Sequence, residues 1–338
     1  MFDENHVFII AEAGVNHNGD INIAKKLIDA ACKAGVNAVK FQTFKAENIV
    51  TQNAPKAEYQ KETTGSGSQF EMLKKLELSF EDHIFLKEYC DRRKIIFLST
   101  PFDFESADLL EKVGIKYYKV SSGDLTNIPL LEYIAKLQKS IILSTGMANL
   151  GEVEIAVKTI RKYMNKSLYL LHCTSNYPTS YKDVNLNAMI TLKNAFKLPV
   201  GYSDHTVGVE VPIAAVAMGA KIIEKHFTLD RHMDGPDHKA SLEPDELKSM
   251  VDSIRNIESA FGDGIKRCNR NEEDTRKVAR KSIVAKTDLK KGTKLSLYNI
   301  AFKRPGKGIS PIYTNIVIDK KINRDVGKDE LITFGLIE

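Results

Sequence analysis

Eight short apolar runs recur between Val7 and Phe261, and a stretch of helix-compatible residues follows each run. We predict strands at 7–11, 38–41, 95–98, 117–120, 141–143, 168–171, 198–202 and 222–223. Strands that are apolar almost throughout are typical of parallel sheets that are buried on both faces. Eight alternating strand–helix units therefore predict an α/β fold of the (β/α)8, or TIM-barrel, type.

The same units could also form an open doubly wound sheet, which more often carries a glycine-rich phosphate loop after its first strand. The sequence has no G-x-G-x-x-G pattern. Polar residues instead finish all eight strands: Glu12, Lys40 with Gln42, Thr100, Ser122, Ser144, His172, His205 and His226. In a barrel these residues would ring one mouth, where they predict an enzyme site with lysines and hydroxyls suited to an anion such as phosphate.

The last two predicted strands end in matching clusters, S-D-H at 203–205 and E-K-H at 224–226. Neighbouring parallel strands would bring the two imidazoles together, where they could hold a divalent cation. The alternative is that each histidine only caps its strand through a hydrogen bond. Two histidines at equivalent positions, each close to an acidic residue, favour a metal site at His205 and His226.

Two segments are predicted to be a long loop and a linker. Residues 45–69 are polar, and loops of this length in a compact domain are usually lids or binding loops. Residues 263–281 are rich in charge and have little apolar periodicity, so they predict a linker that is partly helical at most. We therefore expect the barrel domain to occupy residues 1–262.

The remaining segment, 282–338, alternates short β-branched runs with turn signals such as Lys291-Gly292 and Pro305-Gly306. This pattern predicts a small β-rich domain, and a domain of that size is not strongly stable alone. We expect it to pack against a barrel, either its own or that of a partner chain.

The formal net charge of +5 is mild and not concentrated in long runs, which suits an anionic small substrate and gives little support to nucleic-acid binding. The four cysteines lie far apart without a C-x-x-C motif, which is typical of reduced thiols in the cytoplasm. Cys173 follows His172, and a cysteine next to a histidine can form a nucleophilic pair. Adjacent strand residues face opposite sides of the sheet, however, so we expect a buried structural cysteine. No apolar run is long enough to cross a bilayer, so we expect a cytoplasmic protein without a membrane partner.

Ten motifs follow one another along the chain: I-A-E-A-G-V-N-H-N-G, K-F-Q-T-F, F-L-S-T-P-F-D, S-S-G-D, L-S-T-G-M, H-C-T-S-N-Y-P-T, G-Y-S-D-H-T, E-K-H-F-T-L-D, G-P-D-H-K-A-S and K-R-P-G-K-G-I-S-P. In this order they resemble the bacterial sialic acid synthases, which condense phosphoenolpyruvate with an N-acetylated hexosamine. The resemblance covers nearly the whole chain. It implies a (β/α)8 barrel followed by an antifreeze-like (SAF) domain, in a domain-swapped homodimer.

The resemblance also implies a role for each matching position. A divalent metal, manganese or magnesium, would bind His205 and His226, and Glu12 would be the catalytic acid/base. The positions implied for phosphoenolpyruvate are Lys40, Gln42, Thr100, Lys119, Ser122, Ser144 and Ser203. The positions implied for the sugar are Tyr177, Asp237 and Arg304, the last of which would reach over from the partner chain.

Two positions depart from the family pattern. Asp124 stands where many members have a glutamate, and Ser175 precedes Tyr177 by two residues where asparagine or threonine is expected. It therefore stays open which side chain near Ser175 and Asn176 contacts the ligand.

In the implied chemistry, carbon 3 of phosphoenolpyruvate attacks the sugar aldehyde, water adds at carbon 2 and phosphate leaves. Each step moves a proton, for which a carboxylate is needed. The function expected first is N-acetylneuraminate synthase acting on N-acetylmannosamine. The close alternative is N,N'-diacetyllegionaminate synthase acting on a 6-deoxy diacetamido hexose. A non-catalytic carbohydrate-binding protein on a barrel scaffold is the alternative from another class, and the ring of polar strand ends disfavours it.

Overall fold

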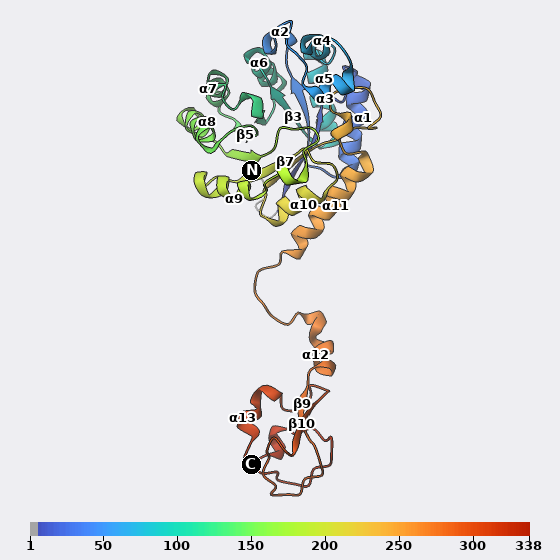
Figure 1. Cartoon of the computed structure of the whole chain (residues 1–338), viewed down its shortest axis with the longest axis vertical. Coiled ribbons are helices and arrows are strands. Elements are labelled where there is room, and N and C mark those ends of the chain that lie inside the picture. The colour runs from blue at the N-terminus through green and yellow to red at the C-terminus, as the bar shows by residue number, and fades with distance from the viewer. Residues whose placement is uncertain (1–5) are drawn as a thin grey trace. The chain divides into compact units, whose positions relative to one another are not determined.

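The computed structural model describes residues 6–338, which divide into two compact units at Phe261 and Gly262. Figure 1 shows both units and labels most of their helices and several of their strands. Each unit has a hydrophobic core of its own. None of the helices in the described part of the chain combines the length and hydrophobicity that a transmembrane segment requires.

Within the described residues of the first unit, eight strands form one sheet, and every recorded strand pair is parallel. The strands are β1 (Phe8–Gly14), β2 (Ala38–Thr43), β3 (Ile96–Pro101), β4 (Tyr117–Val120), β5 (Ser140–Ser144), β6 (Leu168–His172), β7 (Val200–Asp204) and β8 (Ile222–His226). Their order is β3-β2-β1-β8-β7-β6-β5-β4, and β3 also lies beside β4, so the sheet is a nearly closed barrel. The predicted barrel class is confirmed.

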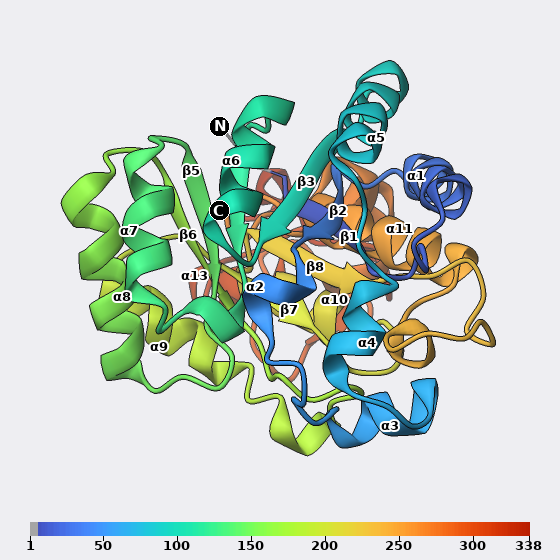
Figure 2. The ribbon, with the colours of Figure 1, turned by 90° about the horizontal axis from the view of Figure 1, so that it is seen from above.

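Helices surround the strands, as Figure 2 shows from above. They are α1 (Ile21–Ala34), α5 (Phe80–Arg93), α6 (Phe104–Val113), α7 (Ile128–Lys136), α8 (Leu150–Tyr163), α9 (Asn187–Phe196), α10 (Glu210–Ala217) and α11 (Pro244–Ala260). Local sequence sets their ends. In α1, for example, the Asp20 carboxylate accepts a hydrogen bond from the Asn22 backbone at 2.7 Å, and Gly35 ends the helix in the left-handed region at φ 83°.

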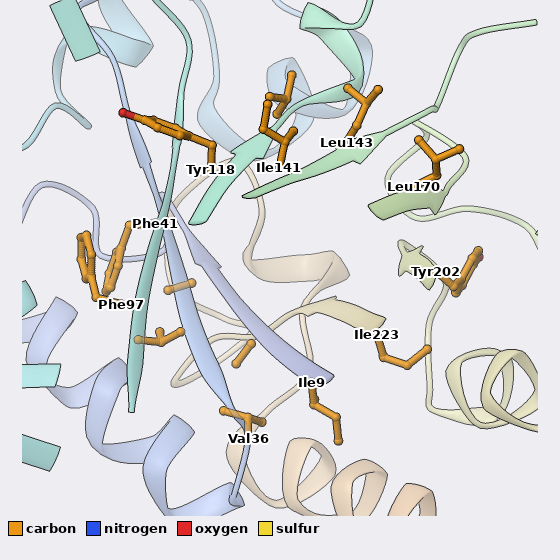
Figure 3. Packing of buried hydrophobic residues seen from close by; sticks show 14 of the residues in the cluster. Ile9, Val36, Phe41, Phe97, Tyr118, Ile141, Leu143, Leu170, Tyr202 and Ile223 are labelled. Carbon is orange, nitrogen blue, oxygen red and sulfur yellow. The ribbon is translucent and has the colours of Figure 1, made fainter. Parts of the chain in front are cut away.

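Side chains of the strands alternate between the helices and the barrel interior. The side chains that face the helices form the large core of Figure 3, which includes Ile9, Phe41, Phe97, Tyr118, Ile141, Leu143, Leu170, Tyr202 and Ile223. The interior begins with a second apolar cluster, which comprises Phe8, Ile10, Ala38, Leu98, Ile142, Tyr169, Leu171 and Ile222. Because strand side chains repeat every second residue, the next interior positions along each strand lie beyond this cluster, towards the carboxyl ends.

The prediction of a continuous loop at 45–69 is wrong. The segment contains two short helices, α2 (Ala46–Ile49) and α3 (Glu58–Thr64), and a third, α4 (Gln69–Lys74), begins at its last residue. Helix α4 starts at a capping box of Ser68 and Glu71, and its Met72 packs with Leu76 in a small apolar cluster. The helices escaped prediction because they are short and their polar residues leave little apolar periodicity.

The second unit contains helix α12 (Glu273–Ala279), the antiparallel strands β9 (Ser282–Ala285) and β10 (Ile300–Lys303), and the short helix α13 (Thr314–Val317). Isolated bridges such as Val284 with Leu331 extend the β-structure of this unit. Its core is small and aliphatic, and helix α12 buries none of its described residues.

Candidate active site

The carboxyl ends of the strands place a polar layer directly beyond the interior apolar cluster. On five strands a polar residue follows an apolar interior residue at a spacing of two: Ile10 and Glu12, Ala38 and Lys40, Leu98 and Thr100, Ile142 and Ser144, and Ile222 and Glu224. Register brings these residues together, because Glu12 is paired with Lys40 of β2 and with His226 of β8. We call Glu12, Lys40, Thr100, Lys119, Ser144, Ser203 and Glu224 the polar layer.

Two buried lysines and two buried carboxylates share the centre of this layer. Lys40 Nζ forms an ion pair with Glu12, lies 3.7 Å from Glu224 Oε2 and donates to Thr100 Oγ1 at 3.2 Å. Lys119 Nζ lies 3.3 Å from Glu224 Oε1. All four charged side chains are at most 5% exposed. Buried charges are costly unless they are paired, so Glu224 stabilises both lysines where they stand.

The two carboxylates have opposite electrostatic environments. Burial raises the pKa of Glu12 to about 7, and the attraction of Lys40 only partly opposes it. Burial also acts to raise the pKa of Glu224, but Lys119 and Lys40, together with the hydroxyl of Ser203, outweigh it and lower that pKa to about 2. Near neutral pH, Glu12 can therefore hold or release a proton, whereas Glu224 stays ionised.

His205 and His226 face each other at the ends of β7 and β8, with their ring centroids 5.7 Å apart. His205 Nδ1 lies 2.6 Å from the Thr174 carbonyl, so it carries the hydrogen and leaves Nε2 free to accept. His226 Nδ1 is buried without a hydrogen-bond partner among the described residues. Burial lowers the pKa of both imidazoles, which favours the neutral form that binds metal ions.

The donor set fits a divalent cation with few protein ligands. No group of three or more histidine, cysteine, aspartate or glutamate side chains with metal-site geometry occurs among residues 6–338. Two neutral nitrogen donors would leave coordination positions open, which suits an octahedral ion better than closed tetrahedral zinc. Asp237 Oδ2, 3.9 Å from His226 Nδ1, is the nearby carboxylate.

Three polar side chains converge on Gly14. A Cβ atom at this glycine would lie 3.2 Å from Glu12 Oε1, 3.4 Å from Gln42 Nε2 and 3.5 Å from Asp237 Oδ2. Gln42 Nε2 also donates to Glu12 Oε1 at 3.4 Å. Burial raises the pKa of Asp237 to about 6. A larger residue in place of Gly14 would therefore crowd the carboxyl group of Glu12, and at φ 52° its backbone would also be strained.

Hydroxyl groups belong to the polar layer or lie close to it. Ser203 Oγ donates to Glu224 Oε1 at 2.8 Å, and Ser122 Oγ accepts from the Gly146 backbone at 2.9 Å. The buried Ser144 Oγ has no hydrogen-bond partner among the described residues, so it is available to an anion. Ser175 Oγ lies 2.3 Å from where a Cβ of Gly146 would be.

The ring of Tyr177 lies against the histidine pair, with its centroid 4.2 Å from that of His205 and 5.7 Å from that of His226. A separate cavity of about 810 Å³ is lined in part by Thr64, Met72 and Pro236. Pro236 directly precedes Asp237 in the chain, so one wall of the cavity belongs to the segment that carries this carboxyl group.

Two predicted positions do not join the site of the first unit. His172 was expected among the strand-end residues of the mouth, but its Nε2 lies 2.8 Å from the Val184 carbonyl and its ring packs 5.8 Å from Tyr202, on the helix side. Cys173 takes the inward position, where its Sγ lies 3.1 Å from Ser122 Oγ. Arg304 belongs to the second unit, where its Nε donates to the Ala279 carbonyl, so its place at a barrel mouth stays a prediction.

Glu224 is the central residue to which the sequence interpretation assigned no role. The sequence could have identified Glu224 as an interior residue, because it precedes His226 by two residues and must face the same side of the strand. What the sequence alone could not provide is its distance to two lysines that come from β2 and β4.

Comparison with known proteins agrees with this geometry. Residues 27–266 match the NeuB family and residues 280–338 match the SAF domain. The chain is 53% identical to N,N'-diacetyllegionaminic acid synthase of Campylobacter jejuni, over 96% of this chain and 98% of the relative. It is 48% identical to the protein of the same name from Legionella pneumophila, over 98% of this chain and 94% of the relative.

Similarity to a solved structure supports the same family. The N-acetylneuraminic acid (sialic acid) synthetase of Leptospira borgpetersenii, crystallised in complex with citrate, has 39% sequence identity and a TM-score of 0.71. The match covers 80% of this chain and 90% of that one. The predicted resemblance to the sialic acid synthases is therefore confirmed at the level of the family.

Proposed function

This chain belongs to the NeuB family and ends in a SAF domain, and we propose that it condenses phosphoenolpyruvate with an N-acetylated aldohexose and water, with release of phosphate. Enzymes of this family are phosphoenolpyruvate-dependent synthases, which form a carbon–carbon bond. The observation that carries the proposal is the polar layer, in which Lys40, Lys119, Glu12 and Glu224 meet at the carboxyl end of the barrel. That end is where TIM-barrel enzymes have their active sites.

The sugar we propose is a 6-deoxy diacetamido hexose, with N,N'-diacetyllegionaminate as the product. The two relatives at 53% and 48% identity carry the name of that synthase, which supports the expectation that the sequence alone had ranked second. N-acetylneuraminate synthesis from N-acetylmannosamine is the second candidate, and the synthetase from Leptospira at 39% identity favours it.

Phosphoenolpyruvate binds through the lysines and hydroxyls of the polar layer. Lys40 and Lys119 offset the charge of its phosphate and carboxylate, while Gln42, Thr100, Ser122, Ser144 and Ser203 supply hydrogen bonds. The hydroxyl of Ser144, which has no hydrogen-bond partner within residues 6–338, supports this assignment, because an anion would satisfy it. Glu224, held ionised by both lysines, keeps their ammonium groups in place before the substrate arrives.

Glu12 is the acid/base of the reaction. A carboxyl group with a pKa of about 7 can take a proton from the attacking water and return it to a leaving oxygen near neutral pH. Its neighbours Gln42 and Asp237 share the space around Gly14, where the sugar and the enolpyruvyl group would meet. Tyr177 and Asp237 would contact the sugar, and the cavity of about 810 Å³ lined by Pro236 would receive its far end.

His205 and His226 would hold the divalent metal, manganese or magnesium. A cation bound there would polarise the aldehyde carbonyl as a Lewis acid. The contribution of the chain is to present two neutral imidazoles, one of which is oriented by the Thr174 carbonyl.

The SAF domain completes the site of a partner chain in a cytoplasmic homodimer, with Arg304 at the partner's sugar. The small core of the second unit and its exposed Tyr298 and Ile312 support a contact of this kind. Complementation tests the swap: chains that carry Glu12→Gln or Arg304→Ala are inactive alone. Their heterodimer should regain about half of the wild-type activity if the two sites are independent. A correctly assembled but inactive heterodimer would contradict the swap.

A phosphate-release assay tests the function itself. Purified protein is given phosphoenolpyruvate, manganese and a panel of aldoses that includes N-acetylmannosamine and the 6-deoxy diacetamido hexose. We expect the highest kcat/KM with the diacetamido sugar. A preference for N-acetylmannosamine would favour the second candidate, and the absence of release with every sugar would favour a non-catalytic carbohydrate-binding protein.

A further inference from the structure

Two charged residues lie directly before the histidine pair and have no part in the chemistry described above. Asp204 precedes His205 and Lys225 precedes His226, on the neighbouring strands β7 and β8. Asp204 and Lys225 are register partners in the sheet, and both side chains are completely buried. A fully buried aspartate–lysine pair is costly unless its geometry and hydrogen bonds are good, so its presence at this point needs a physical reason.

The contacts of this pair enclose His205. Lys225 Nζ lies 2.5 Å from Asp204 Oδ2 and also donates to the carbonyl of Thr206. The Asp204 carboxylate accepts the backbone N–H of Thr206 at 3.1 Å and its hydroxyl at 3.0 Å. Lys225, one residue before His226, therefore holds the residues on both sides of His205.

The pair faces away from the reacting groups. Ser203 and Glu224 come one position earlier on the same two strands, and their side chains meet in the barrel interior at 2.8 Å. Since strand side chains alternate, Asp204 and Lys225 lie on the opposite side, where Tyr202 and Ile223 pack towards the helices. They are therefore positioning residues and not catalytic ones.

We propose that the Asp204–Lys225 ion pair fixes the separation and orientation of the His205 and His226 imidazoles, and thereby sets the affinity of this site for a divalent cation. The inference rests on the metal site proposed above. The pair links the backbone turn that carries one imidazole to the strand that carries the other, and the two rings stand 5.7 Å apart. Residues that orient metal ligands typically change metal affinity by about 10- to 100-fold when they are replaced.

The test is a titration of the full-length enzyme with Mn²⁺, in which electron paramagnetic resonance reports the free ion. We expect Lys225→Met and Asp204→Asn to weaken Mn²⁺ binding by about 10- to 100-fold. Phosphoenolpyruvate binding, measured by calorimetry without metal, should stay close to the wild-type value, because the side chains of the pair point to the opposite face of the strands from the polar layer. Lys225→Arg, which keeps the charge, should retain more of the Mn²⁺ affinity than Lys225→Met.

Arg255→Met is the matched control. Arg255 pairs with Glu258 at 2.9 Å and donates to the Val7 carbonyl at 3.0 Å, at the opposite end of β1. Its loss should lower thermal stability and leave Mn²⁺ affinity unchanged. A fall in Mn²⁺ affinity equal to that of Lys225→Met would show a general effect of destabilisation and would overturn the proposal.

The double variant Asp204→Asn/Lys225→Met covers the case in which a single variant does not fold. It leaves no unpaired buried charge, and replacement of both members of such a pair often preserves the fold. Weak Mn²⁺ binding by the folded double variant supports the proposal, and wild-type affinity overturns it. Failure of the wild-type enzyme to bind Mn²⁺ would overturn the metal site itself, whereas sugar-dependent phosphate release would still test the proposed function separately.

Discussion

The strands line the barrel interior with two layers that are buried to a similar degree and differ in chemistry. The first is an aliphatic and aromatic layer that includes Ile10, Leu98, Ile142 and Ile222. The second, two residues further along the same strands, is the polar layer with Glu12, Thr100, Ser144 and Glu224. The backbone that builds both layers is continuous, so only the side chains distinguish them.

The difference between the layers shows where the barrel gives up stability for chemistry. A buried aliphatic side chain stabilises the fold through the removal of apolar surface from water. Buried ionised groups avoid a large desolvation cost only when they are paired. Replacement of such a pair by well-packed apolar residues is often neutral or stabilising. Four charged groups in the polar layer are therefore best explained by a reaction that needs them. This contrast predicts that substitutions in one layer change activity and those in the other change stability.

The largest effect is expected at the histidine pair, which follows the polar layer on β7 and β8. His205→Ala or His226→Ala should abolish condensation, because the carbonyl of the sugar would lose the cation that polarises it. The phosphate-release assay measures the loss, and circular dichroism checks that the fold is retained. EDTA should inactivate the wild-type enzyme and manganese should restore it. Full activity in exhaustively chelated enzyme would remove the basis for a metal site.

Glu12→Gln should lower turnover by about 10²- to 10⁴-fold, the range for a lost general acid/base. Glutamine keeps the shape and the hydrogen bonds of Glu12 but cannot accept the proton. Phosphoenolpyruvate binding, measured by calorimetry, should survive. Near-normal turnover in this variant would assign the proton transfer to another group.

The two buried glutamates should have opposite effects on stability as the pH changes. The folded pKa of Glu12 is raised from 4.5 to about 7, so its contribution is full below pH 4.5 and is lost as the pH rises through 7. The folded pKa of Glu224 is lowered to about 2, so its contribution is present above pH 4.5 and is lost as the pH falls through 2. Each amounts to about 3 kcal/mol at most, since one pKa unit corresponds to about 1.4 kcal/mol.

Denaturant unfolding between pH 4 and pH 8 measures this difference. Between pH 4.5 and 7 the free energy of unfolding of Glu12→Gln should fall less steeply with rising pH than that of the wild type. At pH 7, Glu224→Gln should be less stable than the wild type, because two buried lysines lose an ionised partner. Parallel pH profiles of the wild type and Glu12→Gln would contradict the raised pKa.

The smallest effect on activity is expected in the apolar layer. Leu98→Ala should lower the free energy of unfolding by about 2–5 kcal/mol, because it leaves a cavity in a closely packed interior. Turnover per folded molecule should change little, since Leu98 lies one layer below Thr100 and bears no polar group. A large fall in the turnover of Leu98→Ala with unchanged stability would contradict the division of roles between the two layers.

The sequence predicted the barrel and most of the polar layer because both follow from the period of two along a strand. Apolar runs marked the strands, and the polar residue after each run marked its carboxyl end. The same period also explains the error at His172: it sits one residue out of phase, so it faces the helices, and Cys173 takes the inward place.

Long-range contacts were beyond the reach of such patterns. The pairing of Glu224 with Lys40 and Lys119 depends on the closure of the barrel, which brings β2, β4 and β8 to a common centre. The contacts of Lys225 with Asp204 and with the Thr206 carbonyl likewise depend on the register between two strands. The short helices between Ala46 and Lys74 depend on tertiary packing more than on local propensity.

The division of roles between Glu12 and Glu224 is the central claim, and infrared difference spectroscopy tests it directly. The carbonyl band of a protonated carboxyl group is followed from pH 5 to pH 8 in the wild type, Glu12→Gln and Glu224→Gln. Besides a band from Asp237 with a midpoint near pH 6, we predict a band that disappears with a midpoint near pH 7, is absent from Glu12→Gln and is still present in Glu224→Gln. A wild-type protein without this band, or one in which the band is lost with Glu224 instead of Glu12, would contradict the account.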